Sequence, residues 1–534
     1  MPFKLSNVLV SDAVDQSCVD LLKAHNINVT CKYKLPKEEL IKEIPKYDGL
    51  IVRSDTKVTA EVLQAAKALR VVGRAGTGVD NIDLAAATSK GVIVLNTPGG
   101  NSISACELTC ALITALARHV AQGCQSLKEG RWDRKLYSGS ELSGKTLAVL
   151  GLGRIGREVA SRMQAFGMKT IGFDPMVSAE EAQAFNVDKK ELEEIWPVAD
   201  YITVHTPLIP QTRNLINADV FSKCKRGVRI VNVARGGIVD EAALLDALKD
   251  GRCAGAALDV YIEEPPKNPT TLELLKHPAV VCTPHLGAST EEAQTRVAVE
   301  IAEQFVALSN PSSPFKITGA VNAPILGATC VPYNNSWIEL TTNLGRLVSK
   351  LLQNQDRTEA KVELVRTGAA LENMSFLGTA ALVGLLSGRT SNGLNLINAP
   401  QLAKEAGLSV SQRYEPSEQK SVTITVTTPA GSNSVTGTIK SKTIHYLLSV
   451  NGVSFSKVGT PVGTATADWN NLQLFRGTNP RKDYLAIAEG LNAKGLDMTF
   501  FSVATSQKAD SFYIAGLPSP LESKLDIPNV AVFF

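Results

Sequence analysis

Three polar side chains that could move a proton and bind an anion each follow a predicted buried strand. Arg235, Glu264 and His285 come shortly after apolar segments in the middle of the chain. The carboxyl ends of parallel strands lie at one edge of a sheet, where open α/β sheets bind their ligands. The sequence therefore predicts that an arginine, a carboxylate and a histidine meet in one site.

This set of residue types suits the oxidation of a secondary alcohol. The reaction needs a base that takes the hydroxyl proton while a hydride leaves the carbon, and histidine changes its charge near neutral pH. Glu264 could orient the ring of His285 and favour its protonated form. Arg235 could bind a substrate carboxylate and polarise the reacting oxygen. We expect these three residues to be catalytic.

Two neighbouring residues offer alternatives to these assignments. His205 also follows a strand, and we expect it to pack beside a cofactor rather than to act as the base. Glu263 adjoins Glu264 and could exchange roles with it.

A glycine-rich turn earlier in the chain predicts a dinucleotide site. An apolar run leads into Gly151-Leu-Gly153-Arg-Ile-Gly156, and a helical pattern follows. These glycines permit a tight turn, a close approach to a pyrophosphate and close packing of helix on strand. The helix N-terminus would offer unpaired N–H groups to the phosphates. The next strand ends at Asp174, whose carboxylate suits the ribose hydroxyls of NAD and would repel the 2′-phosphate of NADP.

Composition predicts a soluble protein of several domains. The chain has 534 residues, 44% of them hydrophobic and 20% charged, with a net charge of +3. A length of this order suggests about three or four domains. No basic run is interleaved with aromatic residues, so we expect no nucleic-acid partner.

Cysteine usage and the absence of an apolar leader indicate the compartment. The nine cysteines include no C-x-x-C pair, which favours free thiols in a reducing environment. None of them has a histidine or a further cysteine at the spacing of a zinc site, so no metal is expected. No apolar run is long enough to cross a membrane. We therefore expect a cytoplasmic protein that does not bind membranes.

Strand and helix patterns divide the chain into four units of the α/β and α+β classes. Residues 1–98 alternate short strands with helices, which indicates a parallel sheet covered on both faces. Residues 99–288 form the nucleotide unit, and the helix Thr290–Leu308 returns the chain, so that 289–315 complete the first unit. The prediction is two Rossmann-like, doubly wound lobes separated by a cleft, the first lobe being the substrate-binding domain.

The C-terminal half is expected to hold two α+β domains, residues 322–455 and 456–534. From residue 472 onward the strands and helices follow the order β-α-β-β-α-β, which is typical of a ferredoxin-like unit. That order includes a short helix over Pro520–Lys524. No catalytic set of residues occurs in this half, and a regulatory or assembly role is expected.

Several separated segments resemble the signatures of the D-isomer-specific 2-hydroxyacid dehydrogenases. They are Leu150–Gly156 with Asp174, Asn232–Asp240 and Pro284–Thr290. Within this family the chain is similar to long-form members that act on 3-phospho-D-glycerate, through Val52–Thr56, Gly73–Asn81 and Asn96–Ser102. The resemblance implies the same catalytic residues, Arg235, Glu264 and His285, and it implies that the last domain is ACT-like.

The resemblance also implies the cofactor and substrate contacts. Asp259 would bind the nicotinamide carboxamide of NAD. Arg53, Arg74 and Asn101 would line the substrate side, and Arg134 would reach a neighbouring subunit. The cofactor contacts would be Thr77, Gly151, Gly153, Arg154, Ile155, Gly156, Asp174, Thr206, Val233, Ala234, Asp259, Leu286, Gly287 and Ala288.

The activity implied by this resemblance is the NAD-dependent oxidation of 3-phospho-D-glycerate to 3-phosphohydroxypyruvate, the first step of phosphorylated L-serine biosynthesis. Several arginines in one cleft suit a small-molecule substrate with two anionic groups. One alternative is a reductase for hydroxypyruvate, glyoxylate or 2-oxoglutarate, and another is an NAD(H)-sensing corepressor. We expect a homo-oligomer, either a tetramer or a dimer.

Overall fold

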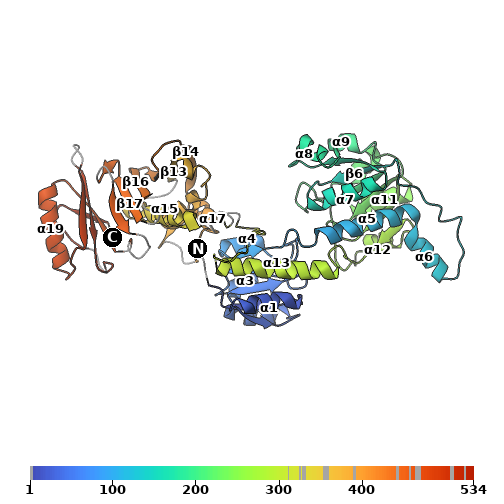
Figure 1. The fold of residues 1–534 in the computed structure, drawn as a ribbon, viewed down its shortest axis with the longest axis horizontal. Helices are drawn as coiled ribbons and strands as arrows, with labels where there is room; N and C mark the ends of the chain where they lie inside the picture. The colour runs from blue at the N-terminus through green and yellow to red at the C-terminus, as the bar shows by residue number, and fades with distance from the viewer. Residues whose placement is uncertain are drawn as a thin grey trace.

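The computed structural model describes residues 4–310, 312–323, 326, 332–352, 360–388, 393–440, 444–455, 459–463, 469, 471–505, 510–521 and 525–533. It contains four sheets, which lie one after another along an extended molecule (Figure 1). The first lobe lies in the middle of the view, the second lobe at one end, and the two C-terminal units at the other end.

The first lobe is built on a parallel sheet with the order β2-β1-β3-β4-β5. This doubly wound order confirms the predicted parallel sheet. Its strands are β1 (Asn7–Val10), β2 (Asn28–Cys31), β3 (Gly49–Val52), β4 (Val71–Arg74) and β5 (Ile93–Leu95), and its helices are α1 (Gln16–Ala24), α2 (Lys37–Glu43), η1 (Ile44–Lys46), α3 (Ala60–Ala65) and α4 (Leu84–Ser89).

The long helix α13 (Glu291–Ser309) packs on the first sheet although it follows the second sheet in sequence. Glycines on two strands of that sheet make room for its aromatic side chain. A Cβ atom on Gly49 would lie 3.0 Å from the ring of Phe305, and a Cβ on Gly73 would overlap both Phe305 and Ile301. The chain therefore returns to the first lobe, as the sequence predicts.

The second lobe is a seven-stranded parallel sheet with the order β12-β11-β10-β9-β6-β7-β8. The order reverses between β6 and β9, which places the ligand crevice at the carboxyl ends of those two strands. The strands are β6 (Thr146–Leu150), β7 (Lys169–Phe173), β8 (Asp188–Lys189), β9 (Tyr201–Val204), β10 (Val228–Asn232), β11 (Cys253–Leu258) and β12 (Val280–Cys282). The helices are α5 (Ser102–Arg118), α6 (Val120–Lys128), α7 (Arg154–Ala165), α8 (Ala179–Gln183), α9 (Leu192–Ile195), α10 (Ala218–Lys223), α11 (Glu241–Lys249) and α12 (Pro269–Lys276).

The third unit is a mixed sheet covered by the amphipathic helix α15 (Pro332–Leu351) and the apolar helix α16 (Leu377–Leu386). Its strand order is β14-β13-β15-β16-β17-β18, and β19 also pairs with β17. The boundary expected at residues 455 and 456 would separate β19 from its partner, so this unit extends at least to Gly463. Its elements are α15 (Pro332–Leu351), β13 (Lys361–Thr367), η2 (Ala369–Leu371), α16 (Leu377–Leu386), α17 (Ala399–Glu405), β14 (Ser409–Glu415), β15 (Ser421–Thr428), β16 (Gly431–Lys440), β17 (Ile444–Val450), β18 (Val453–Ser454) and β19 (Thr460–Gly463).

Two asparagines of the third unit are hydrogen-bonded to the first lobe. The Nδ2 of Asn395 donates to the carbonyl of Gly91 at 2.8 Å, and the Nδ2 of Asn398 donates to the carbonyl of Ser89 at 3.3 Å. Both carbonyls lie at the C-terminal end of α4. The third unit is therefore attached to one short helix of the first lobe.

The fourth unit is an antiparallel sheet with the order β21-β22-β20-β23. This arrangement agrees with the β-α-β-β order predicted for a ferredoxin-like unit, whereas its ACT-like character stays a prediction. Residues 522–524 of the expected short helix lie outside the described residues. The elements are β20 (Leu472–Gly477), α19 (Pro480–Asn492), β21 (Phe500–Thr505), β22 (Ser511–Gly516) and β23 (Ala531–Phe533).

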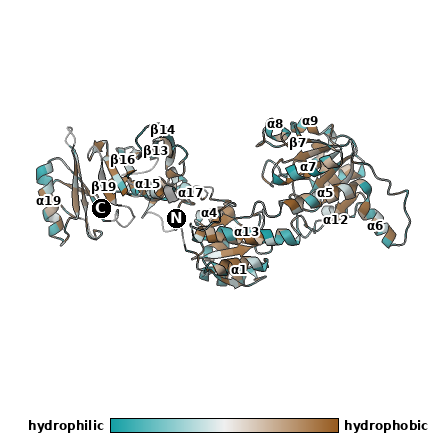
Figure 2. Ribbon diagram, viewed as in Figure 1, coloured by the Kyte–Doolittle hydropathy of each residue, from teal (hydrophilic) through white to brown (hydrophobic). Residues whose placement is uncertain are grey.

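Hydrophobic residues fill the strands and the inner faces of the helices (Figure 2). Among the described residues no single helix is long and apolar enough to cross a membrane, and α5 and α6 pass that test only as a pair bent by 66°. Eight cysteines fall within the described parts of the chain, and all eight are free.

The contact between Gly73 and α13 gives a testable prediction. We expect Gly73→Ala to destabilise the protein by about 1–3 kcal/mol, because the new methyl group must displace Phe305 and Ile301 from a packed core. Gly123→Ala is the matched control, since a Cβ there meets nothing within 4 Å and lies within helix α6. Thermal unfolding measures both variants, and equal melting temperatures for Gly73→Ala and the wild type would contradict the observed packing of α13.

Candidate active site

The glycine-rich turn after β6 leaves an open cradle at the start of α7. Gly151 has a φ of +98°, and a Cβ on it would lie 2.6 Å from the carbonyl oxygen of His205. A Cβ on Gly156 would overlap the carbonyl of Gly151, so helix and strand approach closely here. In contrast, a Cβ on Gly153 would meet nothing within 4 Å. Bare backbone and helix N–H groups therefore border open space, as a pyrophosphate requires.

Polar groups around this cradle also fit a dinucleotide. Asp174 follows β7, and its Oδ2 accepts a hydrogen bond of 2.8 Å from the backbone N–H of Leu152, which fixes the carboxylate beside the turn. The Oγ1 of Thr206 is buried and has no hydrogen-bond partner in the described structure, and its methyl group lies against Gly151. An unpartnered hydroxyl at this position suits a ligand phosphate.

Two further residues expected to contact the cofactor lie at the start of α7. The Nη1 of Arg154 donates to the carbonyl of Pro98 at 3.0 Å, so this side chain joins the helix to the segment that connects the lobes. Ile155 is partly buried against the core of the second lobe.

Asp259, at the end of β11, organises the loop that carries the predicted base. Its Oδ1 accepts hydrogen bonds from Thr283 Oγ1 at 2.6 Å and from the N–H of Leu286 at 2.7 Å, and its Oδ2 accepts from the N–H of Gly287 at 2.8 Å. Burial raises the pKa of Asp259, although these hydrogen bonds oppose the increase. The structure therefore shows Asp259 anchoring a loop, and its contact with nicotinamide stays a prediction.

His285 and Glu264 form a hydrogen-bonded pair at the edge of the cleft. The Nδ1 of His285 lies 2.6 Å from the Oε2 of Glu264, and the Oε1 of Glu264 accepts from the N–H of Tyr261 at 3.1 Å. Burial acts to raise the pKa of Glu264, but the hydrogen bonds from His285 and Tyr261 outweigh it and lower that pKa. Glu264 is therefore an ionised acceptor bound to the Nδ1 of the imidazole, which leaves Nε2 for a substrate.

Arg235 extends from the second lobe toward the first lobe. Its Nε donates to the Oδ2 of Asp80 at 3.0 Å, and its Nη1 donates to the carbonyl of Ala234 at 2.6 Å. The N–H of Ala234 donates to the side chain of Asn232, whose Nδ2 donates to the carbonyl of Arg235. Val233, in the same segment, is 9% exposed. Asn232 thus shapes the turn after β10 on which the arginine lies.

Two arginines of the first lobe, Arg74 and Arg53, extend this group of cations, and Arg74 lies within electrostatic range of the other two. The Nε of Arg74 donates to the Oδ1 of Asn81 at 3.0 Å, and the guanidinium of Arg53 is hydrogen-bonded to the Oε1 of Gln294. Burial lowers the pKa of Arg74 to about 10, and the positive charges of Arg235 and Arg53 contribute to this decrease. Three guanidinium groups therefore share one region, which favours an anionic ligand.

Asn101 and Thr77 meet where the chain passes from the first lobe into α5. The Oγ1 of Thr77 donates to the Oδ1 of Asn101 at 2.5 Å, and the Nδ2 of Asn96 donates to the carbonyl of Thr77 at 2.6 Å. These bonds place both predicted residues at the first-lobe side of the cleft.

The structure does not bring Arg134 to the other arginines of this chain. It lies exposed in the loop that follows α6, which projects from the far end of the second lobe (Figure 1). Within the described residues Arg134 has no hydrogen bond or ion pair, so its expected contact with a neighbouring subunit is not tested by a single chain.

Sequence patterns missed three residues that hold the cleft together: Asp80, Asn81 and Gln294. The Nε2 of Gln294, on α13, donates to the carbonyl of Ala288 at 2.6 Å, while its Oε1 contacts Arg53. Asp80 and Asn81 lie inside Gly73–Asn81, a segment that resembles the family, but the residue pattern of this segment does not indicate which side chains they contact.

His205 is positioned to pack rather than to transfer protons. Its Nε2 lies 3.0 Å from Thr203 Oγ1, and desolvation lowers the pKa of His205 to about 4. Such an imidazole stays neutral and is a weak base at neutral pH, which supports the expected role beside the cofactor.

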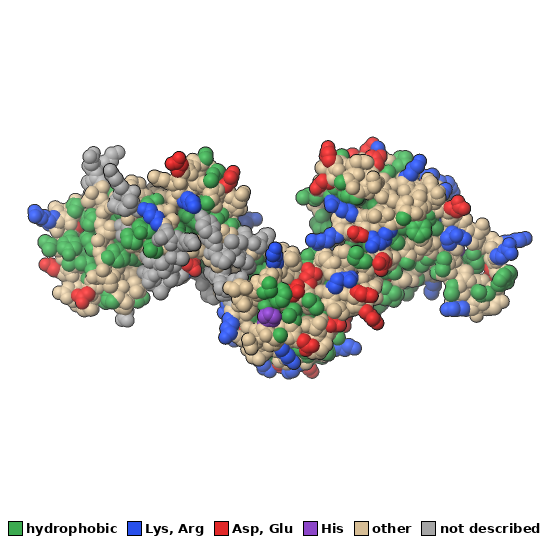
Figure 3. Space-filling view, in the orientation of Figure 1, with side chains coloured by type: hydrophobic (Ala, Val, Ile, Leu, Met, Phe, Trp, Pro, Cys, Tyr) green, Lys and Arg blue, Asp and Glu red, His purple; other side chains and the backbone are tan. Residues whose placement is uncertain are grey.

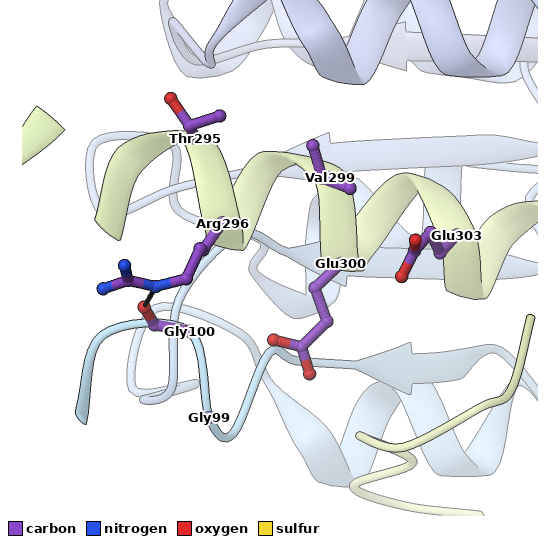
Figure 4. Close-up of a pocket in the computed structure, with 7 residues that line it drawn as sticks. All are labelled: Gly99, Gly100, Thr295, Arg296, Val299, Glu300 and Glu303. Atoms are coloured by element: carbon purple, nitrogen blue, oxygen red, sulfur yellow. Dashed lines mark hydrogen bonds between the residues drawn. The ribbon is translucent and has the colours of Figure 1, made fainter. Parts of the chain in front are cut away.

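A separate hollow of about 370 Å³ lies along α13 beside the connection between the lobes (Figure 4). In Figure 4 the side chain of Arg296 reaches the carbonyl of Gly100, and Glu300 points into the same space. None of the residues predicted for the site lines this hollow.

Two family models match the chain. Residues 110–287 match the NAD binding domain of D-isomer specific 2-hydroxyacid dehydrogenases, and residues 334–451 match the D-3-phosphoglycerate dehydrogenase intervening domain. The first match covers the glycine-rich turn and the loop of His285, and the second covers most of the third unit.

Curated proteins resemble the chain over most of its length. D-3-phosphoglycerate dehydrogenase of Rattus norvegicus is 46% identical over 527 residues, which are 97% of this chain and 96% of the relative. The human protein of the same name is 52% identical over 77% of this chain and 76% of its own length. The Bacillus subtilis protein of that name is 41% identical and covers 83% of both chains.

Solved structures resemble the two N-terminal lobes. A glyoxylate reductase from a Paecilomyces species is 27% identical with a TM-score of 0.54, and the match covers 60% of this chain and 99% of that one. A D-lactate dehydrogenase from Aquifex aeolicus, complexed with NAD and lactic acid, is 28% identical with a TM-score of 0.51, over 57% of this chain and 95% of that one.

Proposed function

Because the chain belongs to the D-3-phosphoglycerate dehydrogenases, within the D-isomer specific 2-hydroxyacid dehydrogenase family, we propose that it oxidises 3-phospho-D-glycerate to 3-phosphohydroxypyruvate with NAD. This is the first step of phosphorylated L-serine biosynthesis. The observation that carries the proposal is the hydrogen-bonded pair of His285 and Glu264, together with three arginines whose charges meet at Arg74.

His285 accepts the proton released in the reaction, and Glu264 stabilises the charge that His285 then carries. The Nε2 of His285 takes the proton of the substrate's C2 hydroxyl, while the Nδ1 stays bound to Glu264. The carboxylate stabilises the imidazolium that forms, since the lowered pKa of Glu264 keeps it ionised. Bound NAD supplies the acceptor for the hydride that leaves C2.

The arginines bind the two anionic groups of the substrate. The charge of Arg235 acts on Glu264, the partner of the base, so Arg235 is assigned to the C1 carboxylate and to the charge that changes at the C2 oxygen. Arg53 and Arg74 are assigned to the phosphate, because both lie on the first lobe and Arg74 is within the electrostatic range of both Arg53 and Arg235. Asn101 completes this side of the cleft.

The cradle after β6 is assigned to NAD rather than to NADP. Asp174 is held beside the turn by the N–H of Leu152, where its negative charge would meet a 2′-phosphate. The open space at Gly153 and the unpartnered hydroxyl of Thr206 support binding of the pyrophosphate at this turn. Asp259 is assigned to the nicotinamide end through the loop that it anchors.

Assembly and location also belong to the proposal. Four large hydrophobic side chains are more than half exposed on α6 and the loop after it: Val120, Leu127, Trp132 and Leu136. Hydrophobic atoms are visible on this projection in Figure 3. Such a concentration of exposed apolar residues supports a homo-oligomer with Arg134 near a neighbouring subunit.

The free thiols support a cytoplasmic location, because disulfides are rare in that reducing compartment.

The role of the base is tested by His285→Ala. We expect kcat for the oxidation of 3-phospho-D-glycerate to fall by about 10²–10⁴-fold, because no other group takes the proton. Binding of NADH, measured by fluorescence, should persist. His25→Ala, an exposed histidine on the first lobe, is the matched control. Full activity of His285→Ala would refute the assignment.

The phosphate assignment is tested by Arg53→Ala. Removing a charge-assisted contact should raise KM for 3-phosphohydroxypyruvate by about 10–100-fold and leave KM for glyoxylate nearly unchanged. The exposed Arg118→Ala variant controls for the loss of one positive charge. Equal effects on the two keto acids would remove the phosphate assignment and favour a glyoxylate or hydroxypyruvate reductase.

The assembly is tested by the double variant Trp132→Lys/Leu136→Lys. We expect light scattering to give a dimer or tetramer for the wild type and a smaller particle for the variant, because charges replace the exposed apolar groups. A monomeric wild type at micromolar concentration would contradict the proposal.

A further inference from the structure

One turn of the first lobe contacts all three arginines of the cleft. The Oδ2 of Asp80 accepts from the Nε of Arg235, and the Oδ1 of Asn81 accepts from the Nε of Arg74, both at 3.0 Å. The Nδ2 of Asn81 donates to the backbone carbonyl of Arg53 at 2.7 Å. Two consecutive residues therefore set the positions of groups from both lobes.

Of these three contacts, the one made by Asp80 joins the first lobe to the second. Asp80 and Arg235 are 155 residues apart in sequence, and Asp80 follows β4 whereas Arg235 follows β10. The guanidinium of Arg235 also lies directly against the bare backbone of Gly78, since a Cβ on Gly78 would overlap it. The Nε edge of Arg235 is thus fixed by Asp80.

Electrostatics explains why such a partner is needed. The pKa of Arg74 is lowered to about 10, mainly by burial and to a smaller extent by the positive charge of Arg235. The negative charge of Asp80 opposes this decrease. Three cations near one another repel, and this repulsion acts to separate Arg235 from Arg74. Asp80 offsets this repulsion at the point where the two lobes meet.

We propose that Asp80 is a positioning residue that holds Arg235 in the orientation in which it binds the substrate carboxylate. This inference rests on the proposed function, which assigns that carboxylate to Arg235. With Nε held by Asp80 and Nη1 by the carbonyl of Ala234, the remaining N–H groups keep a fixed direction toward the substrate. A guanidinium that is oriented before binding loses less rotational freedom when the substrate arrives.

The first test compares Asp80→Ala, Asp80→Asn and Glu38→Ala. Glu38 is an exposed carboxylate on α2 of the same lobe, and its side chain has no hydrogen bond or ion pair within the described residues. We expect kcat/KM to fall about 100-fold in Asp80→Ala and about 10-fold in Asp80→Asn, which keeps an acceptor oxygen. Glu38→Ala should change kcat/KM by less than about 2-fold, and all three melting temperatures should equal that of the wild type.

The second test asks whether Asp80 acts through Arg235. In an Arg235→Gln background, Asp80→Ala should cause no further loss of kcat/KM, because its partner is already absent. A further loss of similar size, or an effect of Asp80→Ala no larger than that of Glu38→Ala, would overturn the inference.

The same variants separate this inference from the proposed function. If the wild type fails to oxidise 3-phospho-D-glycerate, the substrate assignment is refuted, and the Asp80 variants are then compared in the NADH-dependent reduction of glyoxylate. Glyoxylate carries the carboxylate that Arg235 would bind, so the double-variant comparison supports or overturns the role of Asp80 in either case.

Discussion

Asp259 accepts three hydrogen bonds from the segment after β12, and these bonds decide where His285 lies. The backbone carbonyl of Asp259 also accepts from the N–H of His285, whose φ is +55°. A left-handed conformation costs a residue with a side chain about 1–2 kcal/mol, so the loop adopts it only because these bonds compensate. The position of the base relative to Glu264, and therefore the proton transfer, depends on one carboxylate that is buried at the end of β11.

The sequence predicted the parts of the site that follow from local rules. The glycine-rich turn, Asp174, Glu264 and His285 all lie at strand ends, and a parallel sheet brings its carboxyl ends to one edge whatever the details of packing. Contacts between the lobes could not be predicted in this way. The pairing of Asp80 with Arg235, or of Gln294 with Arg53, depends on how two rigid bodies are placed against each other, and hydrophobic periodicity does not encode that placement.

The same limit applies to the C-terminal half. Alternation predicted strands such as Ser421–Val426, but the pattern does not tell which sheet a segment joins. The domain boundary was therefore expected after residue 455, before β19, although β19 pairs with β17. The order of strands in the fourth sheet agreed with expectation because β-α-β-β connections of this length leave few arrangements. Local order is therefore predictable from this sequence, whereas membership of a sheet requires the three-dimensional structure.

The attachment of the third unit to α4 has a spatial consequence. Asn395 and Asn398 bind carbonyls at the C-terminal end of α4, and the helix begins at its N-cap Asp83, immediately after the turn of Asp80 and Asn81. A helix of six residues is about 9 Å long. The attachment of the third unit, where Ile397 also packs on the core of the first lobe, therefore lies within two helical turns of the residues that hold the arginines. Asn395 and Asn398 are thus closer to the anion-binding groups than their distance in sequence indicates.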